Sequence, residues 1–582
     1  MTYDPLQPIG YIVSGSLQGG LEARLGIPPA RIQEGAFVVA RIPAGEHEPG
    51  LQFYGLVTDL RLAASDARFA DEQVAQRFGA HLAALLHGQT LYTTLVFSPH
   101  LMLELPPEGE AARAAWWAEI EAGRKPQPRP MPVKTIPPHH TRVYLATQGD
   151  VDEIFGKADT EGRFFVVGTT REQGYAVRLD LERFIRRPAG VFGATGAGKS
   201  FLVRLLLAGL IHYGRAAILV YDMHNEYGLD ISDPEKKTRV VGLKSKFPAK
   251  VRVVALGRGT FIHGDKPPDY HLEIAMRDIE PEDIELLARE LNLTDTAPTV
   301  LAALVKSFGR DWFRAFRDLV PGKTEVVVDD NGKERRVPAP DSVEGWARAH
   351  NIHEGAARAL HSKLRRLFAK DYIVEEPAEN TLEAMIQDLE AGRTVILSFG
   401  NYETDLDYLF VSNLITRQIR EHWVHRTNAY RSGKESEPRP LVVVVEEAHK
   451  LLSREMAAQT TFNILAREMR KYYVTLLIVD QRPSQIDDEV MSQLGTRIAG
   501  WLGDEDDIRA VLAGLSGRET LRGLLSRLQL GEEVLITGFG VPMPIVVRTR
   551  RYDDAFWREL LGARDLTARS ADEMLADLGF DA

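Results

Sequence analysis

Residues 193–200 read GATGAGKS and match in full the pattern G-x-x-x-x-G-K-[ST], whose residue types and spacing bind phosphate. The glycines permit backbone angles that turn successive N–H groups toward one anion at a helix N-terminus. Lys199 can reach the β- and γ-phosphates of a nucleotide, and the Ser200 hydroxyl can ligate Mg²⁺. We therefore predict a nucleotide site. Its predicted contacts are Gly193, Ala194, Thr195, Gly196, Ala197, Gly198, Lys199, Ser200, Phe201 and Asp222.

A pair of acids follows an apolar strand later in the chain, in LVVVVEEAHK. Ligands of an open parallel sheet lie outside the carboxyl ends of its strands, which is where Glu446 and Glu447 are expected. Glu446 suits the metal side, holding Mg²⁺ through its water shell. Glu447 suits a general base that polarises the attacking water. The pair therefore predicts hydrolysis of the bound nucleotide.

Two other strand ends carry polar groups. Gln481 follows the strand TLLIVD, and its amide can sense the γ-phosphate or orient the water; a buried amide satisfied by backbone is the alternative. The segment ILVYDMHNEY places Asp222, His224 and Glu226 past another strand end. We expect these three to support the Mg²⁺ site, and a simple capping turn is the alternative there.

The helix AREMRKYY, just before TLLIVD, carries the basic residues Arg467, Arg470 and Lys471. Such a cluster is usually a solvated face. In oligomeric nucleotide hydrolases, however, an arginine that reaches a neighbouring subunit's γ-phosphate supplies roughly 10³–10⁵ in rate. For that role we rank Arg467 first and Arg470 second.

From about residue 143, apolar runs alternate with helical stretches, at residues 164–167, 218–221, 251–256, 394–399, 441–445 and 475–479. This pattern predicts an α/β domain with a mostly parallel, RecA-like sheet covered on both faces. Residues 278–387 read as a mostly helical insertion, interrupted by a hairpin at Asn331-Gly332. VLITGF and PIVVRTR predict a closing antiparallel pair, and residues 565–582 predict a C-terminal helical tail.

The region before this domain reads differently. Short β segments at residues 10–14, 36–42, 53–60 and 91–97 predict a small N-terminal β-barrel, followed by a helix at 111–122. The stretch RKPQPRPMPVKTIPPHH should be an extended linker or a strap across a neighbouring domain. The predicted domains are 1–145, including this linker, then 146–564, then the tail.

The amino-acid composition excludes several classes of protein and of functional site. A chain of 582 residues with 44% hydrophobic and 26% charged residues is expected to form two or more soluble globular domains. No apolar run is long enough to span a bilayer, and no secretory signal is evident, so we expect a cytoplasmic protein without membrane contact. Zero cysteines exclude thiolate metal sites and a cysteine nucleophile. A net charge of −11 argues against a surface coated for nucleic-acid binding, but not against a basic channel.

GATGAGKS, DMHNEY, VVVVEEAHK and AREMRKYYVTLLIVDQRPSQID occur in an order that resembles the HerA group within the HerA–FtsK branch of hexameric DNA-pumping ATPases. FFVVGTT and YAVRLDL, ahead of the loop, fit the resemblance, as does the β-rich N-terminal region. The resemblance implies an ATP- and Mg²⁺-dependent homohexamer that pumps double-stranded DNA. It also implies a NurA-type nuclease docked on the barrel, and a role for the pair in resecting DNA ends for recombinational repair.

Carried over by motif, the resemblance implies loop roles for Lys199 and Ser200, acidic roles for Glu446 and Glu447, and the sensor role for Gln481. Its trans-acting arginine is Arg467 or Arg470, with Arg187 a weaker candidate. Two departures are Glu446, where many such ATPases have Asp, and Asn225, where the family often has Gly. Five basic residues are candidates for DNA contact, and a position on the solvated surface is an equally good interpretation of each. They are Lys244, Lys246, Lys363, Arg365 and Arg366.

Two other readings stay open at this point. An ATP-controlled ring could act as a scaffold for another effector, such as a defence complex, and move little DNA. A small-molecule kinase could use the same loop, but the adjacent acids and the candidate trans arginines suit attack by water better.

Overall fold

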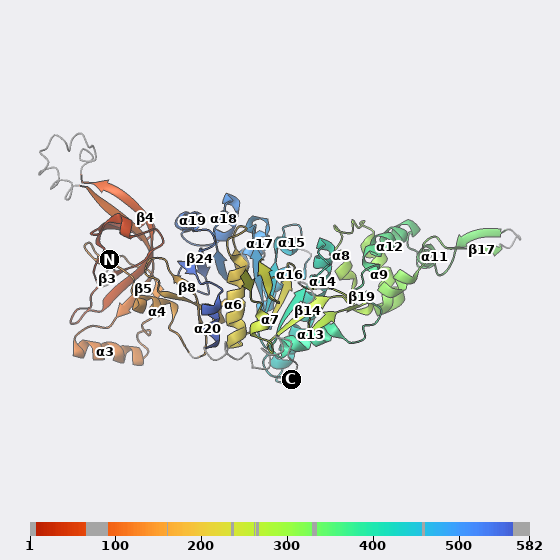
Figure 1. Ribbon diagram of the computed structural model, residues 1–582, viewed down its shortest axis with the longest axis horizontal. Helices are drawn as coiled ribbons and strands as arrows, with labels where there is room; N and C mark the ends of the chain where they lie inside the picture. The colour runs from red at the N-terminus through yellow and green to blue at the C-terminus, as the bar shows by residue number, and fades with distance from the viewer. Residues whose placement is uncertain are drawn as a thin grey trace.

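The computed structural model describes residues 7–65, 91–159, 161–233, 238–260, 262, 267–328, 334–456 and 460–562. Figure 1 shows an elongated molecule with an N-terminal sheet at one end, a central α/β region, and a helical extension tipped by the β17–β18 hairpin at the other. The predicted tail and the Asn331-Gly332 turn lie outside the described residues. No helix within these ranges is both long and apolar enough to cross a membrane.

The central sheet has twelve strands in the order β15-β14-β20-β11-β21-β22-β10-β23-β24-β25-β8-β9. The strands from β15 to β23 are mutually parallel. Their bounds are β10 Ala189–Phe192, β11 Ala217–Asp222, β14 Val251–Leu256, β15 Tyr270–Leu272, β20 Thr394–Ser398, β21 Leu441–Glu446, β22 Val474–Asp480 and β23 Thr496–Ala499. Most of these strands are buried and near-continuous apolar runs, as predicted. The exceptions are β15, which reads YHL and is partly exposed, and β23, which reads TRIA, and neither was predicted.

The other end of this sheet is antiparallel, with β24 Glu533–Gly538, β25 Ile545–Thr549, β8 Phe164–Thr170 and β9 Ala176–Asp180. The predicted closing pair is therefore confirmed as β24 and β25. The inclusion of residues 164–167 in the parallel set was wrong. Because β8 connects to β9 by a short turn rather than by a crossover helix, it pairs antiparallel with β9, and its other neighbour, β25, is antiparallel to it as well.

Helices cover both faces of the sheet (Figure 1). The helices of this central region are α4 Gln148–Phe155, α5 Leu181–Ile185, α6 Lys199–Tyr213, α7 Leu243–Lys246, α13 Thr381–Glu390, α14 Asp405–Arg431, α15 His449–Leu452, α16 Thr461–Glu468, α17 Asp488–Gln493, α18 Glu505–Leu512, α19 Arg518–Ser526 and α20 Asp554–Leu561. The long helix α14 begins where the Thr404 side chain accepts a hydrogen bond from the backbone of Asp407, which satisfies an otherwise unpaired donor. The fold is a mixed α/β fold with the phosphate-loop sequence between β10 and α6.

The predicted helical insertion is present as α8 Pro281–Glu285, α9 Ala297–Phe308, α10 Trp312–Asp318, α11 Val343–Ala349 and α12 Glu354–Phe368. Between α10 and α11 lie the hairpin strands β17 Thr324–Val328 and β18 Glu334–Pro338. Helix α13, within the predicted insertion limits, instead packs on β20 and β11 of the central sheet. A buried pair joins the insertion to the central α/β region, because Arg417 on α14 donates two hydrogen bonds to Asp283 on α8.

The N-terminal sheet has the strand order β2-β1-β7-β3-β4-β5-β6, and β2 also pairs with β5. Its strands are β1 Gly10–Ser16, β2 Gly20–Leu25, β3 Phe37–Ile42, β4 Gly50–Ala64, β5 Leu91–Leu105, β6 Met131–Pro132 and β7 Arg142–Leu145, and α3 Glu110–Glu121 follows β5. The proline-rich stretch contains β6 and leads into β7, which lies between β1 and β3. It therefore connects strands of one sheet and does not cross to another domain.

Candidate nucleotide-binding and hydrolysis site

The phosphate loop, residues 193–200, joins the end of β10 to the start of α6. Gly196 and Gly198 adopt φ values of 78° and 77°, in the left-handed region that favours glycine. A Cβ placed on Gly196 would meet nothing within 4 Å, so the space beside this glycine is open. The loop is fixed from behind, because the backbone N–H of Ala194 donates to the carbonyl of Trp501 at 3.0 Å. This is the cradle that a phosphate group needs.

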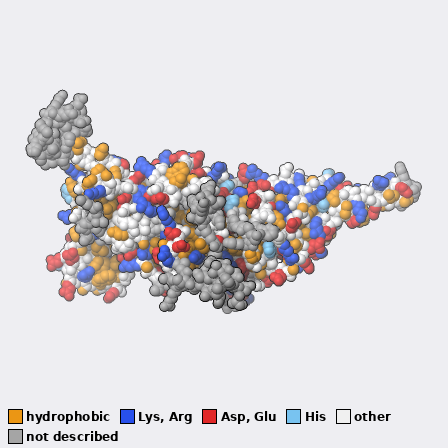
Figure 2. Space-filling model, in the orientation of Figure 1, with side chains coloured by type: hydrophobic (Ala, Val, Ile, Leu, Met, Phe, Trp, Pro, Cys, Tyr) orange, Lys and Arg blue, Asp and Glu red, His pale blue; other side chains and the backbone are white. Residues whose placement is uncertain are grey.

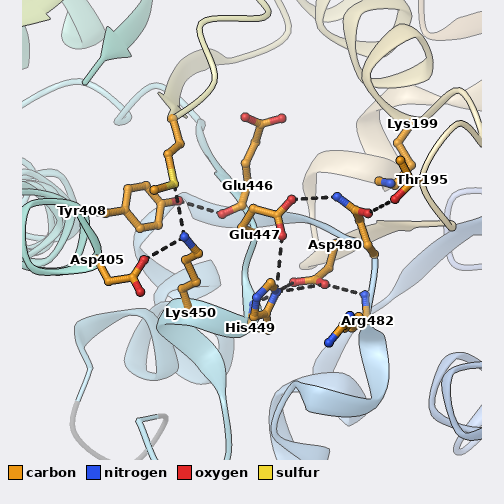
Figure 3. Close-up of polar contacts among 12 residues, drawn as sticks. Thr195, Lys199, Asp405, Tyr408, Glu446, Glu447, His449, Lys450, Asp480 and Arg482 are labelled. Atoms are coloured by element: carbon orange, nitrogen blue, oxygen red, sulfur yellow. Dashed lines mark hydrogen bonds and ion pairs between the residues drawn. The ribbon is translucent and has the colours of Figure 1, made fainter. Parts of the chain in front are cut away.

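Lys199 is drawn beside Thr195 in Figure 3, and its side chain folds back onto the loop. Its ammonium group donates to the carbonyl oxygens of Gly193 and Ala194 at 2.8 and 3.2 Å. Burial lowers the pKa of Lys199, and the nearby carboxylates of Glu447 and Asp480 act in the opposite direction. An anion in the loop would therefore supply the counter-charge that this half-buried ammonium lacks.

Glu446, the last residue of β21, is buried at the carboxyl edge of the sheet. Tyr227 donates a hydrogen bond to Glu446 Oε1 at 2.5 Å, and Tyr408 donates to the Glu446 carbonyl at 2.8 Å. The other carboxylate oxygen, Oε2, is buried and has no hydrogen-bond partner among the described residues. Burial, reinforced by the nearby Asp222, raises the pKa of Glu446 well above its usual range. A carboxylate oxygen left without a partner fits the predicted Mg²⁺ side of the site.

Glu447 and Gln481 connect the acidic strand to the phosphate loop. The Gln481 amide Nε2 donates to Glu447 Oε1 at 3.0 Å, and the Thr195 hydroxyl donates to Gln481 Oε1 at 2.6 Å. Glu447 itself has φ 45°, a strained conformation for a residue with a side chain. The predicted sensor amide therefore lies between the candidate base and the loop, and it is not a buried amide satisfied by backbone.

Two neighbours of Glu447 were missed from the sequence. Asp480 is buried at the end of β22 and accepts hydrogen bonds from the backbone N–H groups of His449 and Arg482, each at 2.7 Å. The His449 ring Nδ1 lies 3.0 Å from Asp480 Oδ2 and 3.6 Å from Glu447 Oε2 (Figure 3). Together these three side chains could hold a metal ion. The sequence feature that could have identified Asp480 is its position as the carboxylate that ends TLLIVD, one residue before Gln481.

Asp222 ends β11 and shapes the turn that follows it. Its carboxylate accepts hydrogen bonds from the backbone N–H groups of Glu226 and Tyr227 at 2.8 and 3.0 Å, and burial raises its pKa to about 6. Asn225 has φ 57°, so it takes the left-handed conformation that a glycine would adopt at this position. His224 is exposed. The turn supports the site through Tyr227, which holds Glu446.

The remaining predicted nucleotide contacts lie at the start of α6. Ser200 is the second residue of that helix, directly after Lys199. The Phe201 side chain is 41% exposed. Its ring lies 6.4 Å from the ring of Tyr552 and 5.2 Å from the guanidinium group of Arg204.

The candidate trans arginines lie apart from this site. Arg467, on α16, is half exposed and pairs with Glu489 at 3.1 Å. Arg470 lies just before the amino end of β22 and lines a cavity of about 380 Å³, whereas the phosphate loop lies at the carboxyl ends of the strands. Arg187 stacks on the Phe539 ring at 4.6 Å.

Most of the candidate DNA-contacting residues make internal contacts. Lys244 donates to the carbonyl of Val251 and to Asp269, and Lys246 lies over the ring of Trp557. Lys363 and Arg366 donate to backbone carbonyls of residues 292 and 290. On the face shown in Figure 2, basic and acidic side chains are interspersed and form no single basic stripe.

The chain is similar to known proteins over much of its length. Residues 165–419 match the family described as the central domain of helicase HerA. The DNA double-strand break repair helicase HerA of Saccharolobus solfataricus is 30% identical over 415 residues, covering 68% of this chain and 70% of that protein. HerA of Sulfolobus acidocaldarius is 23% identical over 444 residues, covering 74% of this chain and 76% of that protein. Among solved structures, VirB4 of Thermoanaerobacter pseudethanolicus aligns with a TM-score of 0.41 at 17% identity, covering 69% of this chain and 100% of that one.

The resemblance read from the motifs is thereby confirmed over a much longer stretch than the motifs themselves. The chain is an ATP-hydrolysing enzyme, and it belongs to the HerA helicase family.

Proposed function

We propose that this chain is an ATP-driven translocase and helicase that pumps double-stranded DNA through a homohexameric ring. It acts with a NurA-type nuclease in the resection of DNA ends for recombinational repair. Family membership supports this, because the HerA relatives are named as DNA double-strand break repair helicases. The observation that carries the proposal is the connection from Thr195 through Gln481 to Glu447, which links the phosphate loop to the candidate base.

We propose a role for each site residue that its position supports. Lys199 leaves the loop carbonyls and pairs with the β- and γ-phosphates of ATP. Ser200 and the unpartnered oxygen of Glu446 would hold Mg²⁺, and the ion would supply neutralisation of phosphate charge. Glu447 accepts a proton from the attacking water, and Gln481 keeps the Glu447 carboxylate oriented.

The trans arginine completes this site from a neighbouring subunit. Strand β22 has seven residues, so its two ends lie about 20 Å apart at the usual rise per residue. Arg470 precedes its amino end and the phosphate loop lies at the opposite edge, so Arg470 is not placed to serve its own subunit. We propose that Arg467 or Arg470 reaches the γ-phosphate of the next subunit.

The N-terminal sheet is proposed as the nuclease-docking domain, spanning residues 1–145. Because β2 pairs with both β1 and β5, six of its strands form a closed hydrogen-bonded circuit, β2-β1-β7-β3-β4-β5. We propose that this circuit is the small β-barrel expected from the sequence. The ATPase domain then spans residues 146–564, and the helical tail follows.

The proposal is tested by measuring ATP hydrolysis with and without duplex DNA, and by displacement of a protein roadblock from that duplex. We expect hydrolysis to rise with DNA and the roadblock to be displaced in one direction. Glu447→Gln should abolish both, while Glu468→Gln, a change at an exposed glutamate paired with Lys471, should abolish neither. Hydrolysis that ignores DNA, with the roadblock left in place, would support the ring scaffold instead.

Assembly is tested separately. Native mass spectrometry should give a hexamer, and co-purification with a candidate nuclease should give a complex whose resection of linear DNA needs both proteins and ATP. A monomer that resects DNA with the nuclease would contradict the ring.

A further inference from the structure

A turn near the C-terminus packs directly against the phosphate loop, although nothing in its sequence resembles a nucleotide motif. This bracing turn, residues 529–533, reads QLGEE. A Cβ placed on Gly531 would lie 3.3 Å from the carbonyl oxygen of Gly196, and one placed on Gly198 would lie 3.5 Å from the carbonyl oxygen of Gly531. Gly531 also has φ 76°, which a residue with a side chain rarely adopts. The two backbones are therefore in contact at the phosphate cradle itself.

A buried ion pair holds the bracing turn in place. Arg171, in the turn between β8 and β9, donates two parallel hydrogen bonds to Glu533, at 2.8 and 2.6 Å. The same carboxylate accepts a hydrogen bond from the backbone N–H of Gln529 at 3.0 Å, which closes the turn. Only 10% of the Arg171 side chain and 5% of the Glu533 side chain are exposed. A buried bidentate pair of this kind fixes geometry in two directions at once.

The third nitrogen of the guanidinium extends this connection to the N-terminal sheet. Arg171 Nη1 donates to the backbone carbonyl of Glu34, just before β3. The next residue, Gly35, is anchored to β4 through its N–H, which donates to the carbonyl of Val57 at 2.7 Å. An exposed pair, Arg527 with the Glu34 carboxylate, lies beside it. Arg171 thus contacts the N-terminal sheet with one nitrogen and the bracing turn with the other two.

We propose that Arg171 and Glu533 are positioning residues of the nucleotide site, which hold the bracing turn against the phosphate loop and tie that turn to the N-terminal sheet. This inference rests on the proposed binding of ATP by the loop. Neither residue touches nucleotide; they act by keeping Gly196 and Gly198 in the phosphate-binding conformation. If the loop leaves that conformation, the apparent dissociation constant rises in inverse proportion to the competent fraction.

The first test measures binding of a fluorescent, non-hydrolysable ATP analogue to the full chain. Arg171→Met should raise its dissociation constant about tenfold, as expected if a tenth of the loops stay competent. The matched control is Arg417→Met, which breaks a buried arginine–carboxylate pair of the insertion and should lower the melting temperature without changing the dissociation constant. Arg527→Ala, which removes only the exposed pair, should also bind as wild type.

Gly531→Ala changes no charge and gives an independent arm, because its Cβ would strain the turn and press on Gly196. It too should weaken binding. Wild-type affinity in both Arg171→Met and Gly531→Ala would overturn the proposal. Lys199→Ala separates this outcome from a failure of the proposed site, since unchanged binding in Lys199→Ala would show that the analogue binds elsewhere.

The tie to the N-terminal sheet is tested by hydrogen exchange. Adding the analogue to wild-type protein should slow amide exchange at residues 34–36, and Arg171→Met should lose that response at saturating analogue. Equal responses in the two proteins would contradict the tie.

Discussion

The side-chain amide of Gln481 donates a hydrogen bond to the carboxylate of Glu447 while its oxygen accepts one from the hydroxyl of Thr195. The Gln481 side chain thus connects Glu447, the candidate base at the end of β21, with the phosphate loop that follows β10. We expect a γ-phosphate bound beside Thr195 to compete for the same amide and so to change the orientation of Glu447.

Removal of this amide should impair hydrolysis more than binding. We expect Gln481→Ala to lower kcat by about 10²–10³, the usual cost of losing one preorganised hydrogen-bonding group in an active site. The dissociation constant for nucleotide should change only severalfold. Steady-state hydrolysis and equilibrium binding check this, with the exposed neighbour Gln485→Ala as the control. A wild-type kcat would remove Gln481 from the hydrolytic centre.

The trans arginine should be detectable by mixing inactive subunits. Arg470→Ala rings and Lys199→Ala rings should each hydrolyse ATP at background rates. If the arginine serves its neighbour, mixed rings contain some sites with both an intact loop and an intact arginine, so mixing should restore activity. The same experiment with Arg467→Ala decides between the two candidates. Failure of both mixtures, with subunit exchange verified, would place the arginine in its own subunit or elsewhere.

His449 should make stability depend on pH. Its hydrogen bond with Asp480 raises the pKa of His449 above the ordinary 6.5. A raised histidine pKa means that the protonated ring stabilises the folded state, fully below about pH 6.5 and progressively less as pH rises through the folded-state pKa. His449→Asn should therefore lower the melting temperature on the order of 1–2 °C at pH 6 and less at pH 8.5. If His449→Asn lowered the melting temperature by the same amount at both pH values, the ring would not carry the stabilising charge.

The buried pair between α8 and α14 should be needed for attachment of the insertion. Arg417→Met leaves Asp283 buried without its partner, and breaking such a pair costs about 3–5 kcal/mol. We expect increased proteolysis of the insertion, residues 279–368, with nucleotide affinity preserved. Arg417→Met combined with Asp283→Leu should recover part of the loss, because no charge then remains buried. Limited proteolysis followed by mass spectrometry distinguishes these cases.

The sequence was sufficient for those parts of the fold and site that are local in the chain. The phosphate loop and the run ahead of Glu446 are continuous segments, and strand ends converge at one edge of a parallel sheet, so Gln481 could be placed beside Glu447. The left-handed turn at Asn225 was also open to prediction, because asparagine tolerates that conformation better than other residues with side chains.

Other features depend on contacts between distant segments. Gly531 lies over three hundred residues from the loop that it touches, and no pattern marks it. In the sequence, Asp480 is simply the last residue of a strand, and its contact with His449 is evident only from the structure. A strand with the apolar pattern of β8 could pair with either parallel or antiparallel neighbours. The short connection to β9 is the feature that indicates antiparallel pairing.

The position of β7 sets the order in which the chain can fold during synthesis. This strand fills the space between β1 and β3 but is encoded more than a hundred residues after the start of β3. Until Leu145 has emerged, β1 and β3 each present an unpaired edge. Residues 1–130 expressed alone would carry the same open edges permanently, so a fragment meant to represent the N-terminal domain has to extend past Leu145.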